Sequence, residues 1–335
     1  MKKFVSIILA MLLVLGLAAC GNEAETTAAA GGSSAADASQ SDDEVFVVGI
    51  CQLVQHAALD SATQGFKDAL IEALGDKVEF DEQNASGEAV NCTTIINGFT
   101  AKGVDLIMAN ATPALTAAAA ATKEIPILGT SVTSYAAALE IDDFNGIVGG
   151  NISGTSDLAD LKEQAALFPA WLPEAKTVGL LYCSAEANSI YQVEVVEKEL
   201  ADMGIATQRF AFTDTNDVGS VTQAACDACD ALYIPTDNTA ASNTEAIANI
   251  TIPAKTPVIA GEMSICKGCG LATLSIDYYD LGVATGKMAA KILTGEADIS
   301  TMEIEYAPNL QKYYNAAMCE TFGITPLEGY EALTD

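Results

Sequence analysis

The chain has 335 residues, of which 50% are hydrophobic and 18% are charged. A chain of this length and apolar content is expected to fold into about two domains and is not a disordered protein. It carries 45 acidic against 15 basic residues, a formal net charge of −30. So acidic a surface repels nucleic acid and anionic lipid headgroups, which argues against both as partners.

The N-terminus has the pattern of an export signal. Residues 1–3 read Met-Lys-Lys, residues 4–19 form an apolar run, and residues 17–20 read Leu-Ala-Ala-Cys. The apolar run is slightly short for a membrane-spanning helix. The small residues before Cys20 resemble a bacterial lipobox, which implies cleavage before Cys20 and attachment of a diacylglycerol, with fatty acids such as palmitate, to its sulfur. An ordinary secretory signal and an uncleaved anchor are the alternatives.

A polar segment separates this signal from the rest of the chain. Residues 21–44 contain no aromatic residue and no Leu, Ile or Val. Such a composition cannot bury enough apolar surface to offset the entropy of ordering, so it predicts a flexible tether. We therefore expect a signal peptide over 1–20, a disordered tether over 21–44, and an exported globule on the extracytoplasmic face of a bacterial membrane, held only through lipid on Cys20.

From Val45 onward the pattern alternates between strand and helix. Helical spacing covers 57–74 and 189–203, with apolar residues on one face of each. Strands are expected at 45–51, 78–82, 104–109, 125–129, 177–182, 205–212, 231–234, 257–260 and 271–275. Two runs of alternating β and α units predict an α/β fold with two doubly wound parallel-sheet lobes.

Ligands of such sheets bind beyond the carboxyl ends of the strands. Hydroxyl, amide and carboxylate residues gather there, and each alone reads as an ordinary helix cap. Thr112, which precedes Pro113, is expected to be an N-cap. Such polar residues recur at the strand ends of both predicted lobes, which favours one shared binding cleft over a set of separate helix caps. The predicted ligand-binding residues are Gln55, His56, Thr112, Thr133, Ser134, Ser156, Asn188, Ser189 and Asp237.

Segments across residues 45–333 resemble the substrate-binding proteins of ABC importers, in the subgroup with tryptophan- and phenylalanine-type binders. The segments that carry the resemblance are QHAALDSATQGFKDAL (55–70), NATPALTAAAAATKEIPI (110–127), AEANS (185–189), PTDNT (235–239), IDYYDLGVATGKMAAKIL (276–293) and NLQKYYNAAMCETFGITP (309–326). The resemblance implies a type I periplasmic binding protein fold, with three crossings between lobes that close on a ligand. It also implies ABC permease and ATPase subunits as partners, a monomer, no catalysis and no cofactor.

That fold sets the expected domain boundaries. Residues 45–150 and 281–298 would form the N-terminal lobe, and residues 151–280 and 299–335 the C-terminal lobe. The first crossing would fall near 147–157. The sequence contains no nucleophile elbow, P-loop or GxGxxG motif, which disfavours an enzyme. An exported ligand sensor on the same fold, without a transport role, is the alternative function.

The residue types at the strand ends indicate the ligand. Arg209 is the only arginine and lies in a predicted strand away from them, so no bidentate clamp for an anion is available. A carboxylate would instead be held by helix N-termini and hydroxyls near Thr112, Thr133 and Ser134. Asp237 would accept an ammonium, while Asn238 or Thr239 capped the next helix. This pattern predicts a zwitterionic α-amino acid, and the resemblance implies that its side chain is aromatic or otherwise apolar.

Two departures from the related family leave the aromatic side chain in doubt. Gln55 precedes His56 where the family commonly has an acidic residue, and Ser134 follows Thr133 where it often has Asp. His56 is the only histidine. A structural role is its alternative to a ligand contact.

The cysteines raise a separate question. Cys226–Cys229 and Cys266–Cys269 are CxxC pairs that together resemble a zinc site. The 36 residues between the pairs are more than such sites use, and the topology puts the pairs at opposite sheet ends, so we expect no metal. A disulfide between Cys266 and Cys269 stays open. Buried thiols are expected at Cys51, Cys92 and Cys319, and Cys183 is a possible ligand contact.

Overall fold

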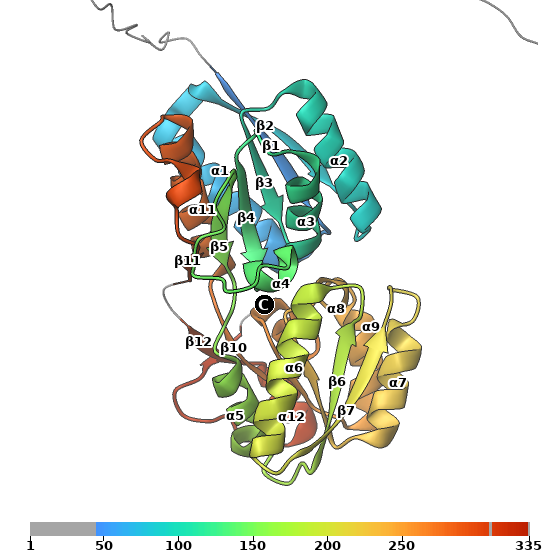
Figure 1. Cartoon of the computed structure of the whole chain (residues 1–335). Helices are drawn as coiled ribbons and strands as arrows, with labels where there is room; N and C mark the ends of the chain where they lie inside the picture. The colour runs from blue at the N-terminus through green and yellow to red at the C-terminus, as the bar shows by residue number, and fades with distance from the viewer. Residues whose placement is uncertain (1–44, 308–309, 334–335) are drawn as a thin grey trace, which may run out of the picture. The chain divides into compact units, whose positions relative to one another are not determined.

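The structure is a computed structural model that describes residues 45–307 and 310–333 (Figure 1). These described residues belong to one compact unit. The predictions for Cys20, the signal peptide and the tether therefore lie outside the described residues. Within the described part, no helix is both long and apolar enough to cross a bilayer.

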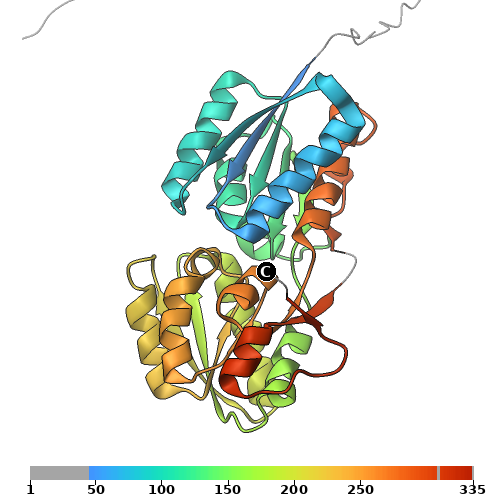
Figure 2. The same ribbon diagram turned by 180° about the vertical axis from the view of Figure 1, so that it is seen from behind.

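The first sheet has the strand order β11-β5-β4-β3-β1-β2 and is parallel throughout. Helices α1 (Ala57–Leu74) and α11 (Tyr278–Leu293) lie side by side on one face, and α2 (Ala89–Lys102) and α3 (Thr112–Ala121) cover the other (Figures 1 and 2). The strands are β1 Phe46–Gln52, β2 Val78–Asn84, β3 Leu106–Asn110, β4 Ile127–Val132, β5 Ile152–Ser156 and β11 Glu305–Tyr306.

Alternate residues of these strands point to opposite faces, and this builds two separate cores. Val48 and Ile50 pack under α1 and α11, whereas Cys51 and Ile107 pack under α2 and α3. Glycines let α1 and α11 approach closely. A Cβ on Gly282 would lie 2.0 Å from the Ala62 carbonyl oxygen, so the spacing of these helices requires glycine there. This contact ties α11, late in the chain, to the first sheet.

The second sheet has the order β13-β12-β10-β9-β8-β6-β7, in which β12 runs antiparallel to β10 and the other pairs are parallel. Its strands are β6 Thr177–Cys183, β7 Ala206–Phe212, β8 Ala231–Ile234, β9 Val258–Ala260, β10 Ala272–Ser275, β12 Gln311–Tyr314 and β13 Glu331–Ala332.

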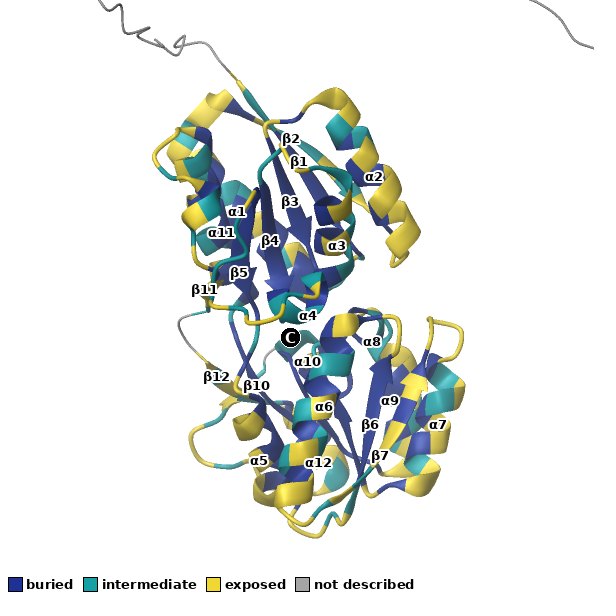
Figure 3. Ribbon diagram, in the orientation of Figure 1, coloured by how far each residue is buried: buried dark blue, intermediate teal, exposed yellow. Residues whose placement is uncertain are grey.

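Helices cover both faces of this sheet as well. One face carries α5 (Leu161–Trp171), α6 (Ala187–Asp202) and α12 (Ala316–Phe322), and the other carries α7 (Val218–Ala228), α9 (Thr244–Ala254) and α10 (Met263–Cys269). Two short helices, α4 (Tyr135–Leu139) and α8 (Asn238–Ala241), follow strand ends, and one-turn 3-10 helices lie at Gly75–Lys77 and Ile299–Thr301. Figure 3 shows that the central strands of both sheets are buried beneath these helices.

The predicted fold class is confirmed, and all nine expected strands form within a few residues of their expected bounds. The chain passes between the sheets after β5, after β10 and after β11. The expected boundaries at residues 150 and 298 need correction, because β5 and β11 lie beyond them and still belong to the first sheet. The division into two lobes that move as bodies stays a prediction.

The pattern failed to predict β5 for a physical reason. It reads Ile-Ser-Gly-Thr-Ser, with one apolar side chain. Its buried hydroxyls are satisfied internally, since Thr155 Oγ1 lies 3.2 Å from Thr130 Oγ1 and 2.8 Å from Thr285 Oγ1. A strand stabilised by paired hydroxyls between β4 and α11 has no hydrophobic signature in the sequence.

Candidate functional site

The strand ends of both sheets converge on one small cavity. Its volume is about 10 Å³, room for about one water-sized probe. An amino acid therefore enters only if the walls move apart. The lining residues are His56, Leu59, Ser131, Thr133, Asp157, Asn188, Thr236, Asp237, Asn238, Ala241, Glu262 and Tyr278. They lie at or after the carboxyl ends of β1, β4 and β5 in the first sheet and of β6, β8, β9 and β10 in the second.

Unpartnered polar atoms gather around this cavity. Among the residues that the structure describes, ten buried side-chain polar atoms have no hydrogen-bond partner. Four of the ten belong to the lining: His56 Nδ1, Ser131 Oγ, Asp157 Oδ1 and Asn188 Oδ1. Because buried polar groups in folded proteins are normally paired, such a concentration indicates a site that is completed by a ligand.

Three carboxylates line the same cavity, and the lining contains no lysine or arginine. Burial raises the pKa of Asp157 to about 6, with a further rise from the charge of Glu262. Burial also raises the pKa of Asp237 to about 8, assisted by the charge of Glu186. The Glu262 carboxylate caps α10, accepting from the Ile265 and Ser264 N–H groups at 2.7 and 2.6 Å. The surplus of buried acceptors suits a cationic ligand group.

Arg209 does not line this cavity, in agreement with the prediction. It is on β7, and its guanidinium pairs with Glu197 at 2.6 Å. No arginine is therefore left among the described residues to clamp an anion at the cavity.

Asp237 combines two roles. As the N-cap of α8 it accepts from Ala240 N at 2.8 Å through Oδ1, while Oδ2 accepts from Cys183 N at 2.6 Å and from Ser189 Oγ at 2.7 Å. The expectation that Asn238 or Thr239 would cap this helix was wrong, because Asp237 itself occupies the cap position. It lines the cavity as well, so its ligand role stays a prediction.

Four of the predicted ligand-binding residues line the cavity: His56, Thr133, Asn188 and Asp237. Three others make internal contacts. Ser134 caps α4 by accepting from Ala137 N at 3.2 Å, Ser156 Oγ donates to the Thr133 carbonyl oxygen at 3.0 Å, and Ser189 supports Asp237.

The remaining two lie elsewhere. Gln55 is exposed and borders a larger neighbouring hollow. Thr112 is the first residue of α3, so the N-cap prediction was wrong. Ala111 holds that position, with φ of 90° and no side-chain cap. Thr112 Oγ1 is buried without a partner, but the residue does not line the cavity.

Several lining residues were missed from the sequence. Asp157 follows β5, the strand whose polar pattern hid it, and it accepts from the Tyr278 hydroxyl at 3.0 Å. Ser131 is aimed inward by a backbone with φ of 53°, at an irregularity in the pairing of β4 with β5. Glu262 follows β9 and is the N-cap of α10, a position that by itself indicates only a helix cap. Tyr278 lies in the IDYYDLG segment and is the first residue of α11, directly after the chain crosses from the second sheet to the first.

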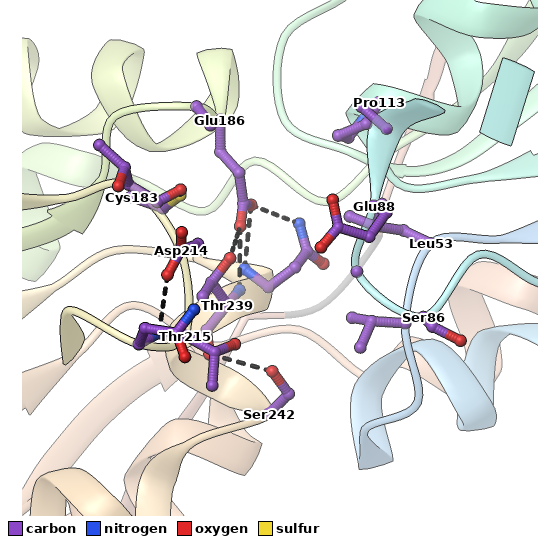
Figure 4. Close-up of a pocket in the computed structure, with 17 residues that line it drawn as sticks. Leu53, Ser86, Glu88, Pro113, Cys183, Glu186, Asp214, Thr215, Thr239 and Ser242 are labelled. Atoms are coloured by element: carbon purple, nitrogen blue, oxygen red, sulfur yellow. Dashed lines mark hydrogen bonds between the residues drawn. The ribbon is translucent and has the colours of Figure 1, made fainter. Parts of the chain in front are cut away.

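Two larger hollows flank the small cavity. The first, of about 280 Å³, has Leu53, Ser86, Glu88 and Pro113 on one side (Figure 4). Residues at and after the strand ends of the second sheet, including Cys183, Glu186, Asp214 and Thr239, form the other side. The second, of about 730 Å³, contains three tyrosine side chains, Tyr278, Tyr279 and Tyr313. A ligand larger than the central cavity would extend into one of them.

The eight cysteines in the described part of the chain are free. Cys266 and Cys269 lie in α10, where Cys269 Sγ donates to the Ile265 carbonyl oxygen at 3.4 Å, so they form no disulfide here. Cys51, Cys92 and Cys319 are buried as predicted, and Cys183 borders the 280 Å³ hollow. No group of His, Cys, Asp and Glu in residues 45–307 and 310–333 is arranged to hold a metal ion.

Comparison with known proteins gives a consistent result. The model of the ABC transporter substrate binding protein family matches residues 47–330. A tyrosine-binding protein of Clostridioides difficile is 32% identical over 307 residues, which cover 88% of this chain and 85% of that protein.

Two solved structures are also similar. An ABC domain from Streptococcus pneumonia in complex with L-Trp has a TM-score of 0.82 at 31% identity, covering 87% of this chain and 100% of that chain. The ligand-free, open structure of a substrate-binding protein with adhesive properties from Clostridium difficile has a TM-score of 0.66 at 33% identity, covering 87% and 99%.

Proposed function

We propose that this chain captures an amino acid with an aromatic or other apolar side chain for import. The chain belongs to the ABC transporter substrate binding protein family, and the proposal follows from that membership. The observation that carries the proposal is the cavity between the sheets. Three carboxylates, four unpartnered polar atoms and no lysine or arginine surround it. An α-ammonium group matches the acceptors Asp157 Oδ1, Asn188 Oδ1 and Asp237.

The ligand carboxylate would meet donors of the first sheet's loops. The hydroxyls of Ser131, near the end of β4, and of Thr133, directly after that strand, lie in the cavity lining, and the N-terminus of α1 follows His56. Backbone N–H groups at a helix N-terminus and hydroxyls can bind a carboxylate without a cationic side chain. A ligand bound through its ammonium mainly to one lobe and through its carboxylate to the other would join them, which is how binding would drive closure.

The comparisons support both the ligand class and the closed state. One relative is named a tyrosine-binding protein, and one similar structure contains L-Trp. The two structures are nearly equal in sequence identity to this chain, yet its TM-score is 0.82 with the Trp complex and 0.66 with the ligand-free open structure. This difference and the cavity of about 10 Å³ support a closed arrangement of the lobes.

A thermal-shift and calorimetric screen tests the ligand class with the chain lacking its first 20 residues. We expect tyrosine, tryptophan or phenylalanine to raise Tm, because a ligand of the native state stabilises by mass action, by about 2.7 kcal/mol at 100 times Kd. Tyramine keeps the ammonium and should retain part of the affinity of tyrosine. 3-(4-Hydroxyphenyl)propionate, which lacks the ammonium, should not bind because the buried carboxylates repel it.

Two results would contradict this assignment. One is a deaminated analogue that binds as tightly as its parent amino acid. The other is a Tm shift by a different class of small molecule when no amino acid causes one.

We also propose that lipid on Cys20 anchors the protein to the extracytoplasmic face of the membrane. The lipobox-like sequence and the family's role support this anchor. Cells that express the protein should incorporate labelled palmitate into it, and Cys20→Ser should lose the label and release the protein from membranes. Equal labelling of the variant would place the lipid elsewhere.

A further inference from the structure

Glu186 is a buried carboxylate for which the structure offers no cationic partner. It is 4% exposed and lies between β6 and α6. The salt bridges of the described residues do not include it. Its Oε1 accepts from Thr239 N at 2.9 Å and from Thr239 Oγ1 at 2.8 Å, and its Oε2 accepts from Asn238 N at 3.0 Å (Figure 4). These donors require an acceptor at both terminal atoms of the side chain, which a carboxylate provides. Glutamine would place its amide NH2 group against one of the backbone N–H donors, so it cannot replace Glu186 without a clash of N–H groups.

The same carboxylate fixes the orientation of the Asn238 amide. Asn238 Nδ2 donates to Glu186 Oε2 at 2.7 Å, and because Glu186 only accepts, the amide nitrogen must face it. Asn238 Oδ1 then faces the opposite way, 3.2 Å from His56 Nε2. An amide oxygen cannot donate, so the proton of this bond resides on His56 Nε2.

The bond between His56 and Asn238 crosses the cleft. His56 precedes α1 in the first sheet's lobe, and Asn238 begins α8 in the second. Among the hydrogen bonds of the described structure, it is the only one that links residues 46–156 to residues 177–275. Such a bond can exist only while the two loops are together, so it favours the closed state whether or not a ligand is bound.

The proton on Nε2 also decides what His56 offers a ligand. A neutral imidazole with a proton on Nε2 presents Nδ1 as an acceptor. His56 Nδ1 is buried and has no protein partner, and the residue shares the cavity lining with Asn188 and Asp157, whose free oxygens are acceptors too. The ring thus joins the acceptors available to an ammonium.

We propose that Glu186 is a positioning residue which, through Asn238, sets the proton on His56 Nε2, and that the chain Glu186–Asn238–His56 is a latch built into the protein that holds the lobes closed. Its effect on ligand binding rests on the proposed function, whereas its effect on closure does not. A latch of this kind acts after the lobes meet, so it should slow ligand release without changing ligand capture.

The first arm of the test uses no ligand. Small-angle X-ray scattering should give a larger radius of gyration for Glu186→Gln and for Asn238→Ala than for the unmodified protein. Asn238→Ala removes the amide oxygen but leaves Glu186 its bonds to Thr239, so it serves if Glu186→Gln fails to fold. Thr239→Val, which removes one hydroxyl bonded to Glu186 and none of the chain to His56, is the matched control and should stay compact.

The second arm measures ligand kinetics by stopped flow with the amino acid that binds. Loss of one latch hydrogen bond should raise the dissociation rate about tenfold, equivalent to about 1.4 kcal/mol. The association rate should change by less than about twofold. The ligand should dissociate from the double variant Glu186→Gln, His56→Ala no faster than from His56→Ala, because both changes break the same chain of hydrogen bonds.

Three results would overturn the latch: a ligand-free protein as expanded as its variants, a Thr239→Val protein that behaves like Glu186→Gln, or additive effects in the double variant. If the unmodified protein binds no amino acid, the proposed function fails while the scattering arm still decides on the latch.

Discussion

Asp237→Ala should abolish amino-acid binding and also lower the stability of the protein. The variant removes a carboxylate that, in the proposed function, binds the ligand ammonium, and truncation of one partner of a buried charge pair costs about 2–5 kcal/mol. Affinity should therefore fall by about 100-fold or more. Asp237 also accepts three hydrogen bonds, from Ala240 N, Cys183 N and Ser189 Oγ, which the alanine leaves without a partner. Loss of the cap adds about 1 kcal/mol of destabilisation.

A matched variant separates the two effects. Asp160 is likewise an N-cap, of α5, and accepts from the Lys162 and Glu163 N–H groups at 3.0 Å, but it does not line the cavity. Asp160→Ala should lower Tm and leave the calorimetric Kd unchanged. If Asp237→Ala, folded at a temperature below its Tm, binds the amino acid with unchanged Kd, then Asp237 is a cap and nothing more.

The position of the site could be predicted because it follows from strand ends. Parallel sheets gather their carboxyl ends on one edge, so locating β1, β4, β6 and β8 was enough to identify His56, Thr133, Asn188 and Asp237. Each of them follows its strand within about six residues. The apolar pattern of each strand is local, so the sequence alone is enough to locate the strand ends.

The orientation of side chains at the strand ends could not be predicted in this way. Ser156 and Ser189 stand at suitable positions, yet their hydroxyls bond to Thr133 and Asp237 inside the fold. Glu186 has the sequence position of a helix cap but reaches α8, about fifty residues later. Such partners depend on how two loops meet in space, and no periodicity encodes that meeting.

The three carboxylates of the cavity lower the stability of the fold, and this links stability to function. Asp157, Asp237 and Glu262 face one small volume without a lysine or arginine in the lining. Burial disfavours the charged form of a carboxyl group, and it raises the pKa of both Asp157 and Asp237, so these groups destabilise the closed fold. An ammonium supplies the missing positive charge. The carboxylates that would bind an ammonium therefore lower the free energy of unfolding. A variant that lacks one of them should be more stable.

Asp157→Asn should be that variant: more stable than the unmodified protein at neutral pH, and a weaker binder. Burial raises the Asp157 pKa from 3.8 to about 6, a difference that corresponds to about 3 kcal/mol above pH 6. Asparagine can still accept from the Tyr278 hydroxyl through its amide oxygen. It carries no charge to bury and none to attract an ammonium, so amino-acid affinity should fall about tenfold or more.

The sign of the pH dependence distinguishes this cause from better packing. A raised acid pKa means that the folded state binds the proton more tightly, so the unmodified protein loses stability as pH rises from about 4 to about 6. The amide of the Asp157→Asn variant cannot titrate. In urea unfolding, the stability gained by Asp157→Asn should therefore be smallest near pH 4 and largest above pH 6. A gain that is the same at both pH values, or no gain at neutral pH, would show that the Asp157 carboxylate does not destabilise the ligand-free fold.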